Sequence, residues 1–438
     1  MQVLKKAEFF KFKVDGQNFV FNRDSLAIFS VPPQIDYQSE KNLTRLVKDE
    51  TEKARLVDRL TLRTIALNLT NTCNFNCRYC FANHGQYDQP GLEMTEKIAQ
   101  KAVTLLFKNV TLNHQKRVAI AFFGGEPLLK WDLIQKIVNF AEKSKPLRVK
   151  LRFLLTTNAS LLDKEKAKYL KKHQFSVMVS LDGPRESHDC NRKLATGKGT
   201  YNLILPKILE ANKLIPLTFR ATITNNNLDL VKIVRHFKKL GAKMITFGLD
   251  NDHLKNENYA EIERFYRQLA KMYYQDIRQG KYYEITNFTE IILQLVFRER
   301  KVSHCNAGLS YMGVAADGSL YKCPRFTGKA DHKFGEVDDA KKMISRQRIF
   351  RADLGNNAGT RNTYCFSCPF VFLCGGLCHY DLSQKGKDDT EIIFEQCQLR
   401  KAIYIEVMKI YVKLPLETRK RFLAILSSSL KGGEEIKE

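Results

Sequence analysis

The sequence lacks any apolar run long enough for a transmembrane helix. Residues 1–12 carry charges but no apolar segment of the kind that a secretory signal peptide needs. Internal repeats and low-complexity tracts are also absent. Because hydrophobic residues make up 44% of the 438 residues, we expect a folded protein of two or three domains. We place this protein in the cytoplasm.

Acidic residues are scarce relative to basic ones. The chain has 47 Asp and Glu residues against 72 Lys and Arg residues, which gives a net charge of +25. Such a charge can indicate a nucleic-acid partner, but no nucleic-acid-binding motif is present. Much of the charge falls on predicted helices such as Asp163–His173, where lysines form a solvated face. An acidic peptide substrate is compatible with this charge.

Cysteine, in contrast, is abundant. Eleven cysteines in a cytoplasmic chain are not expected to form disulfides, because that compartment keeps thiols reduced. Metal or cluster ligation explains so many cysteines better.

From residue 62 onward, predicted strands alternate with predicted helices. The strands are expected at 65–70, 118–123, 153–157, 175–181, 219–224 and 244–249. The helices are expected near 93–108, 131–143, 163–172, 201–213, 228–239 and 257–278. This alternation favours an α/β fold with a parallel sheet, and a partial (β/α)6 barrel fits it. Active sites in such sheets lie at the carboxyl ends of the strands.

The two ends of the chain follow different patterns. The beginning predicts short strands at 9–14, 19–21 and 26–31, with a turn at Asp15-Gly16, and then a helix over 39–60. Residues 281–400 hold seven cysteines and little regular pattern, and residues 401–430 indicate a helix. We therefore predict four segments: a β-meander plus helix at 1–60, the barrel at 61–280, a cysteine-rich domain at 281–400, and a helix and tail at 401–438.

Three cysteines directly follow the first predicted strand of the barrel. Cys73, Cys77 and Cys80 have the spacing C-x3-C-x2-C, and Tyr79 precedes the last. Three thiolates can hold a four-iron cluster and leave one iron open for another ligand. Zinc binding and ordinary buried thiols are the alternatives. The run resembles the signature of the radical SAM enzymes, in which the open iron chelates S-adenosylmethionine (SAM). In that family one electron cleaves SAM to a 5′-deoxyadenosyl radical, which abstracts a hydrogen atom.

Polar residues at the ends of later strands extend this resemblance. Gly124-Gly125-Glu126-Pro127 is similar to the family's GGE motif, which holds the amino group of SAM, and its glycines allow the backbone to approach a ligand. Arg192 matches a position that is often arginine and pairs with the SAM carboxylate, although a surface ion pair is its alternative. For the polar residues at the ends of the third and fourth strands, Asn158, Ser180 and Asp182, capping and turn formation are the alternatives. The resemblance implies this SAM-binding set: Tyr79, Gly124, Gly125, Glu126, Asn158, Ser180, Asp182 and Arg192. Arg220 and Thr222 on the fifth strand have weaker claims.

The later cysteines form a second pattern, C-x12-G-x4-C followed by C-x2-C-x5-C-x3-C and a final cysteine. It resembles the SPASM domain, which carries auxiliary iron–sulfur clusters in radical SAM enzymes that modify peptides and proteins. Zinc is the alternative metal for these cysteines. The resemblance implies one cluster held by Cys365, Cys368, Cys374 and Cys397. It implies another held by Cys305, Cys323 and Cys378 alone, since residues 306–317 offer no fourth cysteine. An open iron there would suit a substrate thiolate.

Cys190 is the cysteine that these assignments leave over. A buried thiol is the default for a lone cysteine, but its place near the expected SAM site makes it a candidate for a catalytic role.

The resemblance favours a peptide maturase that forms thioether cross-links in a cysteine-rich precursor. It implies three [4Fe–4S] clusters, SAM, and an electron donor such as flavodoxin or ferredoxin. Formylglycine-forming sulfatase maturases and carbon–carbon cross-linking maturases are alternatives, and an electron-transfer module is the non-enzymatic one. In sulfatase maturases an aspartate thought to act as base follows the cysteine that matches Cys323, whereas Pro324 stands here. The N-terminal meander resembles a leader-peptide-binding domain, and a strand cap on the barrel is its alternative.

Overall fold

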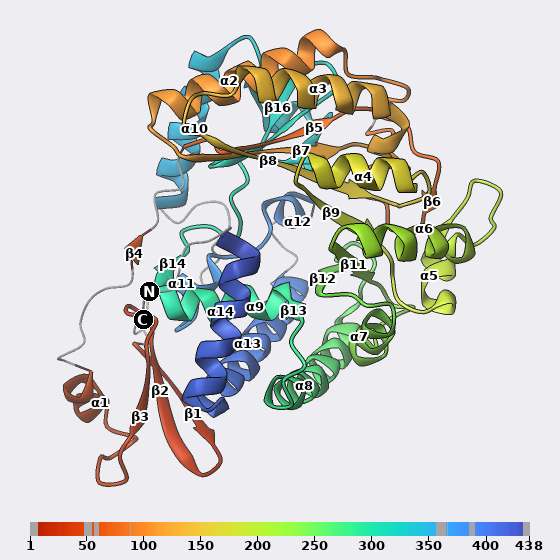
Figure 1. Cartoon of the computed structure of the whole chain (residues 1–438). Helices are drawn as coiled ribbons and strands as arrows, with labels where there is room; N and C mark the ends of the chain where they lie inside the picture. The colour runs from red at the N-terminus through yellow and green to blue at the C-terminus, as the bar shows by residue number, and fades with distance from the viewer. Residues whose placement is uncertain are drawn as a thin grey trace.

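The computed structural model describes residues 8–47, 55–56, 61–87, 89–355, 365, 367–384 and 390–431. Its main element is a parallel sheet whose strands alternate with helices (Figure 1). Six strands follow the predicted order: β5 (Thr64–Asn68), β7 (Arg117–Phe123), β8 (Lys150–Thr157), β9 (Phe175–Ser180), β11 (Leu217–Ile223) and β12 (Met244–Leu249). Six helices follow them: α2 (Glu96–Leu112), α3 (Trp131–Ser144), α4 (Lys164–Lys172), α6 (Tyr201–Leu214), α7 (Leu230–Lys239) and α8 (Asn256–Arg278). The predicted α/β sheet is thus confirmed.

Alternation of side chains explains how the sheet presents two different faces. In β7, Val118, Ile120 and Phe122 are buried, whereas the intervening residues are only partly buried. Phe122 stacks with Phe153 of the adjacent strand β8 and with Phe175 of β9, one strand further on, with ring centroids 5.7–6.1 Å from it. This apolar face packs under the helices, and the opposite face is left to line a cavity.

The sheet is larger than the sequence indicated. Four short strands extend it: β13 (Glu284–Ile285), β15 (Tyr311–Val314), β16 (Ser319–Tyr321) and β17 (Lys333–Glu336). The order is β13-β12-β11-β9-β8-β7-β5-β15-β16-β17, and β15 runs parallel to β5. The expectation of little regular pattern over 281–400 is therefore wrong, because β13 pairs with β12 at one edge of the sheet and β15, followed by β16 and β17, extends it from β5 at the other.

Helices also interrupt that region. They are α9 (Thr286–Phe297), α10 (Ala340–Gly355), α11 (Val371–Cys374) and α12 (His379–Gln384). The sheet continues past residue 280, so the hairpin β15–β16 carries Cys323 to the edge of the barrel strands. The four predicted segment boundaries stay predictions.

The N-terminal strands form a separate antiparallel sheet. It comprises β1 (Phe9–Val14), β2 (Gln17–Asn22) and β3 (Ile28–Val31), so the predicted meander is confirmed. The helix predicted over 39–60 is shorter: α1 (Glu40–Leu46) begins at its cap Ser39, and β4 (Arg55–Leu56) pairs instead with β14 (Glu299–Arg300). Residues 48–54 and 57–60 lie outside the described residues.

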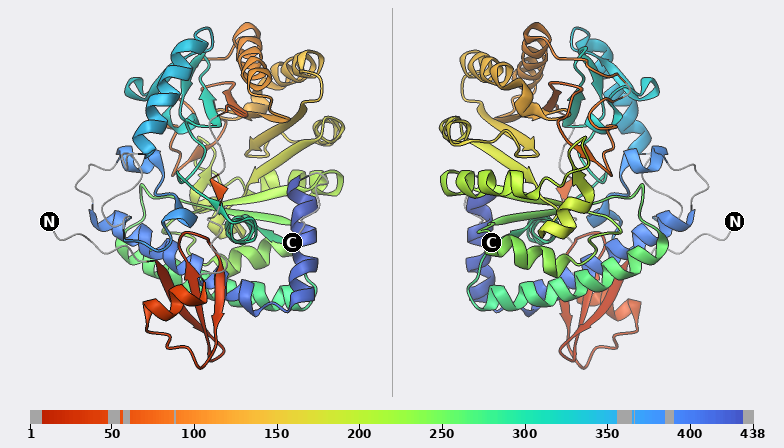
Figure 2. Two further views of the ribbon diagram at one scale, coloured as in Figure 1. Left: turned by 90° about the vertical axis from the view of Figure 1, so that its left-hand side faces the viewer. Right: turned by 90° about the vertical axis from the view of Figure 1, so that its right-hand side faces the viewer.

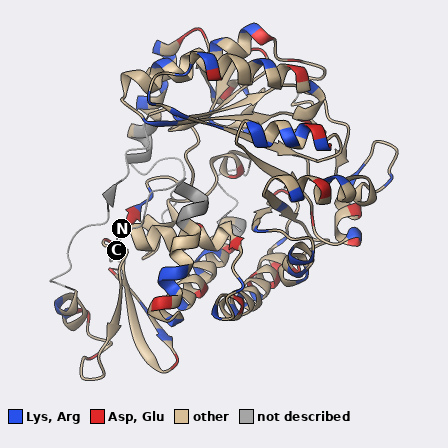
Figure 3. Cartoon of the chain, in the orientation of Figure 1, with Lys and Arg blue, Asp and Glu red and all other residues tan. Residues whose placement is uncertain are grey.

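Two helices close the chain, α13 (Thr390–Lys413) and α14 (Leu416–Lys431). The predicted helix over 401–430 is confirmed, except that it breaks before Leu416 because Pro415 cannot donate a helical hydrogen bond. Both helices lie beside α8 (Figure 2). Lys and Arg positions are spread over the outer helices (Figure 3), and the lysines of α4 are mostly exposed. No helix among the described residues combines the length and the apolar character that a membrane span requires.

Candidate active site

A cavity of about 400 Å³ opens at the carboxyl ends of the parallel strands. Cys73, Cys77 and Cys80 line one side of it, on the loop after β5. The cavity brings together most of the predicted SAM-binding residues, namely Tyr79, Gly124, Gly125, Glu126, Asn158, Ser180 and Arg192. Asp182 is fully buried directly behind this lining. The positions agree with the predicted set, whose binding roles stay predictions.

The Gly-Gly-Glu loop is bonded to the cysteine loop. The Gly125 amide donates to the Thr70 carbonyl at 2.9 Å, and the Glu126 amide donates to the Thr72 carbonyl at 3.0 Å. A Cβ on Gly125 would lie 2.1 Å from the Thr72 oxygen. We expected these glycines to make room for a ligand, but Gly125 is required because the cysteine loop passes so close to it.

Glu126 is a buried carboxylate that already has three hydrogen-bond donors. Its Oε1 accepts from the Leu128 amide at 3.1 Å and from Thr157 Oγ1 at 2.7 Å, and its Oε2 accepts from the Asn158 amide at 2.8 Å. Burial raises the pKa of Glu126 to about 7, although these bonds oppose the shift. A carboxylate offers about four lone-pair sites, so one remains for an ammonium group.

Asp182 organises the other wall of the cavity. Its carboxylate accepts from Tyr79 Oη at 2.6 Å, from Arg192 Nε at 3.0 Å and from the Thr222 amide at 3.0 Å. Burial opposes the Arg192 charge, but Asp182 holds the pKa of Arg192 above its usual value. Arg192 Nη1 also lies 3.7 Å from Cys77 Sγ. Arg192 is therefore part of a buried ion pair rather than a surface one.

His188 was not predicted as part of the site, yet it fixes the position of Arg192. It lies in the short helix α5 (Arg185–Asn191) and accepts a hydrogen bond from the Asp182 amide at its Nδ1 (3.3 Å). Its Nε2 contacts Thr200 Oγ1 at 2.9 Å, and that hydroxyl donates to the Arg192 carbonyl. Burial lowers the pKa of His188 to about 4, so the ring is neutral. The sequence signal that could have identified His188 was its position four residues before Arg192.

The far rim of the cavity comes from segments distant in sequence. Cys323, Pro324 and Arg325 follow β16, while Asp250 and Asp252 follow β12. Arg325 bonds to Asp381 at 2.6 Å, which lies on α12. The cavity thus lies between the first cysteine run and the later cysteine-rich region.

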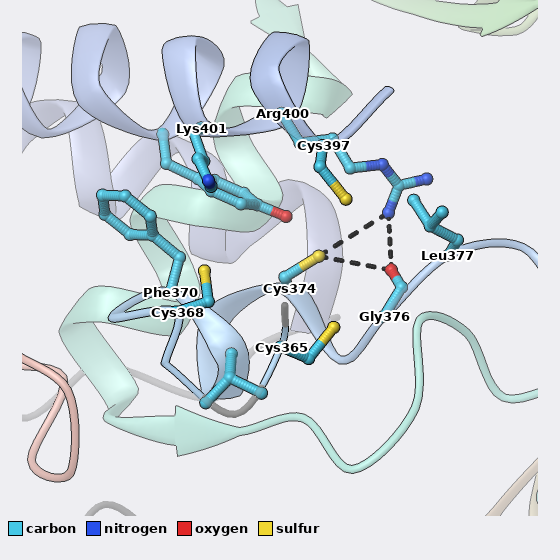
Figure 4. Close-up of a pocket in the computed structure, with 11 residues that line it drawn as sticks. Cys365, Cys368, Phe370, Cys374, Gly376, Leu377, Cys397, Arg400 and Lys401 are labelled. Carbon is cyan, nitrogen blue, oxygen red and sulfur yellow. Dashed lines mark hydrogen bonds between the residues drawn. The ribbon is translucent and has the colours of Figure 1, made fainter. Parts of the chain in front are cut away.

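Four later cysteines line a second cavity, shown in Figure 4. Their side chains point toward one another from α11, α13 and the adjoining loop: Cys365, Cys368, Cys374 and Cys397. Arg400 reaches into this group from α13. Its Nη1 lies 3.8 Å from Cys374 Sγ and donates to the Gly376 carbonyl at 2.8 Å.

The remaining three cysteines of the pattern also lie near one another. Cys305 and Cys378 both act electrostatically on Cys323, and burial raises the pKa of Cys323 to about 12. Arg325 Nη1 lies 3.8 Å from Cys378 Sγ. The three groups that the sequence pattern predicted are therefore each assembled in space.

The chemistry of these donors fits iron–sulfur clusters. Burial raises the pKa of Cys73 to about 12 and of Cys397 to about 11, so these thiols would stay neutral without a nearby cation. Bound metal deprotonates such thiols and offsets the cost of burying them. Among the described residues, no group of three or more Cys, His, Asp or Glu side chains is arranged for a single metal ion.

Cys190 lies apart from all three groups. Its Sγ donates to the Glu186 carbonyl at 3.1 Å within α5, and Cys190 is not part of the cavity lining. This placement gives no support to the catalytic role considered for it.

Comparison with known proteins identifies the class. Residues 67–269 match the family model described as the radical SAM superfamily, so the chain contains a radical SAM domain. It is 27% identical over 332 residues to a cysteine-type anaerobic sulfatase-maturating enzyme of Clostridium novyi, covering 70% of this chain and 85% of that one. It is 22% identical to the radical SAM cyclopropyl synthase TigE of Paramaledivibacter caminithermalis, covering 82% and 75% of the two chains.

Solved structures share the fold. A structure of anSMEcpe with bound AdoMet superposes with a TM-score of 0.68 at 23% identity, over 80% of this chain and 98% of that one. Streptococcus suis SuiB bound to its precursor peptide SuiA gives a TM-score of 0.51 at 14% identity, over 86% and 96% of the chains. The protein is a radical SAM enzyme with a partial α/β barrel and a cysteine-rich C-terminal region.

Proposed function

We propose that this enzyme is a radical SAM peptide maturase that modifies a cysteine-containing peptide or protein. The observation that carries the proposal is the cavity of about 400 Å³, because it joins the first cysteine run to the later cysteine-rich region. A substrate side chain in this cavity would contact SAM on one side and the Cys323 segment on the other. Named relatives that act on sulfatases support a protein or peptide substrate.

In this proposal Cys73, Cys77 and Cys80 hold the SAM-binding cluster. When bound, that cluster supplies the electron that generates the 5′-deoxyadenosyl radical from SAM. Glu126 accepts a hydrogen bond from the SAM ammonium with its remaining lone pair. Arg192, fixed by Asp182, faces the SAM carboxylate, and Tyr79 stays ordered through the same aspartate.

The surrounding aromatic side chains exclude water from the reacting atoms. Phe81, Tyr87, Phe123 and Tyr311 line the same cavity. Phe81 stacks with Phe123 at a centroid distance of 6.4 Å and meets Tyr87 edge-on at 6.0 Å. A dry cavity protects a radical from side reactions and strengthens the hydrogen bonds that orient SAM.

We assign two auxiliary [4Fe–4S] clusters to the later cysteines. Cys365, Cys368, Cys374 and Cys397 would ligate one cluster completely. Cys305, Cys323 and Cys378 would ligate the other through three thiolates, which leaves one iron for another ligand. Because Cys323 lines the main cavity, that iron would be within reach of a substrate thiolate.

Thioether formation is the reaction that we favour for this site. It joins a cysteine sulfur to a carbon with net loss of two hydrogen atoms. Pro324 follows Cys323, so the aspartate that sulfatase maturases carry at this place is missing. Formylglycine formation is the second candidate, because sulfatase-maturating enzymes are among the relatives of this chain.

The N-terminal sheet would hold a leader peptide. The structure pairs β2 with both β1 and β3, and among the described strands β3 has no partner on its other edge. An extended peptide can add to such an edge by β-augmentation. Electrons would come from a flavodoxin or ferredoxin.

Anaerobic reconstitution tests the proposal directly. The chain should bind about twelve irons, and with SAM and dithionite it should release 5′-deoxyadenosine. Mass spectrometry of a cysteine-containing precursor encoded near the gene should show loss of two hydrogens. Loss of sulfur with gain of oxygen would instead establish formylglycine formation. Absence of 5′-deoxyadenosine from protein with full iron would refute the enzymatic assignment.

A further inference from the structure

Arg220 is a cation in the main cavity that has no ion-pair partner among the residues that the structure describes. It lies in the middle of β11 and lines the cavity with Arg192 and Arg325. Among the described residues, neither a hydrogen bond from its guanidinium nor an ion pair to it is found. Arg192 is paired with Asp182 at 3.0 Å, and Arg325 is paired with Asp381 at 2.6 Å. Arg220 therefore differs from the two other arginines of the lining.

The strand directs Arg220 into the cavity. Along β11, Leu217, Phe219 and Ala221 are buried, and Phe219 packs on Phe237 of α7 with ring centroids 5.4 Å apart. Since side chains alternate along a strand, Arg220 points to the opposite face.

Gly248 of the adjacent strand β12 makes space for this guanidinium. A Cβ built on Gly248 would lie 2.5 Å from Arg220 Nη2 and 3.3 Å from its Cζ. The guanidinium thus lies directly over a position without a side chain. A side chain at position 248 would therefore displace the guanidinium from the place that it occupies.

An unpaired guanidinium in a partly buried cavity is unfavourable. Burial lowers the pKa of Arg220, and Arg192 and Arg325 add to the effect. Desolvation of a charge is costly unless an opposite charge compensates it. A ligand that brings an anion would recover this cost, and a planar fork of N–H donors matches a carboxylate best.

We propose that Arg220, seated over Gly248, binds a carboxylate of a ligand in the main cavity. The carboxylate belongs either to SAM or to an acidic residue of the peptide substrate. The peptide source fits the arrangement better, because Arg192 already faces the SAM side next to Cys77 and acts electrostatically on Glu126. This inference rests on the proposed function for the presence of SAM and a peptide in the cavity.

The test compares Arg220→Gln with three other variants of the reconstituted chain. Gly248→Ala keeps the arginine but adds the Cβ that displaces its guanidinium. Arg220→Lys keeps the charge but loses the planar fork, so it should show an intermediate loss. Arg152→Gln removes an equal charge from an exposed position of β8 and is the matched control. Iron content and thermal unfolding show that each variant is folded and loaded.

The binding measurements separate the two sources. Affinity for SAM is compared with affinity for decarboxylated SAM by anaerobic calorimetry. Affinity is also measured for two cysteine peptides that differ only in a glutamate or glutamine beside the cysteine. If Arg220 binds the SAM carboxylate, Arg220→Gln and Gly248→Ala should weaken the affinity for SAM on the order of 10- to 100-fold. The affinity for decarboxylated SAM should then stay unchanged. A peptide carboxylate predicts unchanged SAM binding and loss of the preference for the glutamate peptide.

The inference is overturned if neither discrimination changes in Arg220→Gln while the wild type binds SAM. It also fails if Arg152→Gln has the same effect, since the charge would then act only at long range. Failure of the wild type to bind SAM at all would overturn the proposed function together with this inference, so the two failures are distinguishable.

Discussion

Each of the three cysteine groups has an arginine beside one sulfur. The group of Cys73, Cys77 and Cys80 and the group of Cys365, Cys368, Cys374 and Cys397, called the first and second groups below, differ in how this arginine is neutralised. Near the first group, Arg192 Nη1 lies 3.7 Å from Cys77 Sγ, and the Asp182 carboxylate pairs with the same arginine. Near the second group, Arg400 Nη1 lies 3.8 Å from Cys374 Sγ and bonds to the Gly376 carbonyl and to His304 Nδ1. Among the described residues, no carboxylate lies within ion-pair distance of Arg400.

This difference bears on how each cluster would hold electrons. A cation beside a cluster stabilises its reduced form, and hydrogen bonds to the sulfurs act in the same direction. Asp182 cancels that effect beside Cys77, which suits a cluster that must donate an electron to SAM. Arg400 remains uncompensated beside Cys374, which suits a cluster that accepts one. We therefore expect the second group to have the higher reduction potential.

Cysteine replacement is the strongest way to test whether the two groups have different tasks. Cys73→Ala should abolish 5′-deoxyadenosine release, because the two remaining thiolates would not hold the cluster whose open iron binds SAM. Cys374→Ala should keep SAM cleavage but lose product formation. Iron content, electron paramagnetic resonance and quantification of 5′-deoxyadenosine measure these outcomes. Cys190→Ala is the control and should change none of them, since the hydrogen bonds of its thiol to the described part of the chain go to carbonyls of α5.

Equal loss of SAM cleavage in Cys73→Ala and Cys374→Ala would break the comparison. The two groups would then act as one structural unit instead of as separate centres.

Asp182→Asn tests the first cysteine group, where a carboxylate neutralises the arginine. Tyr79 and the Thr222 amide donate to different oxygens of Asp182, so asparagine keeps an acceptor for one of them and leaves the Arg192 charge buried without its anion. The expected cost is about 3 kcal/mol of folding stability, because breaking a buried pair leaves an uncompensated charge. Chemical denaturation of the protein without clusters measures it. Asp163→Asn removes an exposed ion pair to Lys166 and should cost less than about 1 kcal/mol.

The sequence predicted the barrel and its strand ends better than the rest of the molecule. Each strand and helix of the barrel has a strong period, so Glu126 and Asn158 could be placed at strand ends from the amino-acid pattern, whereas Arg192 is found through the family resemblance. The cysteines are grouped through the resemblance of their pattern to the radical SAM and SPASM families. These features depend on residues close together in the sequence.

What the sequence did not reveal depends on contacts between distant segments. The strand β15 forms only because β5 offers an edge, and Tyr311 reaches the cavity as a result. His188 belongs to the site because it contacts Thr200, and Arg400 of α13 lies beside Cys374 of α11. Both contacts join residues that are separated in the sequence. No periodicity or motif encodes such pairings, because they arise from packing of elements that are far apart in the chain.

Arg400→Gln tests the second cysteine group, where no described carboxylate pairs with the arginine. Loss of one positive charge next to Cys374 should lower the reduction potential of that cluster on the order of 100 mV, as expected for a charge about 6 Å away at an effective dielectric of about 20. Redox titration followed by electron paramagnetic resonance measures the shift. Arg267→Gln, whose guanidinium is paired with Glu263 and Glu406, is the control and should leave the potential unchanged. An unchanged potential in Arg400→Gln would contradict the assignment.

The smallest effect concerns His188, the neutral imidazole behind the paired arginine. Because its folded pKa of about 4 lies below the usual value of 6.5, the unfolded chain binds the extra proton more readily. The stability that neutral His188 contributes is complete above pH 6.5 and is lost as pH falls toward 4. Between pH 7 and 5.5 this loss should be about 1 kcal/mol. Denaturation of the cluster-free wild type and of His188→Gln at both pH values isolates it, since the difference between the two proteins should narrow at the lower pH. A difference that is independent of pH would show that folding leaves the pKa of His188 at its usual value, and a difference that widens at the lower pH would show that His188 is charged in the folded enzyme. Either result would contradict the neutral link between Asp182 and Thr200.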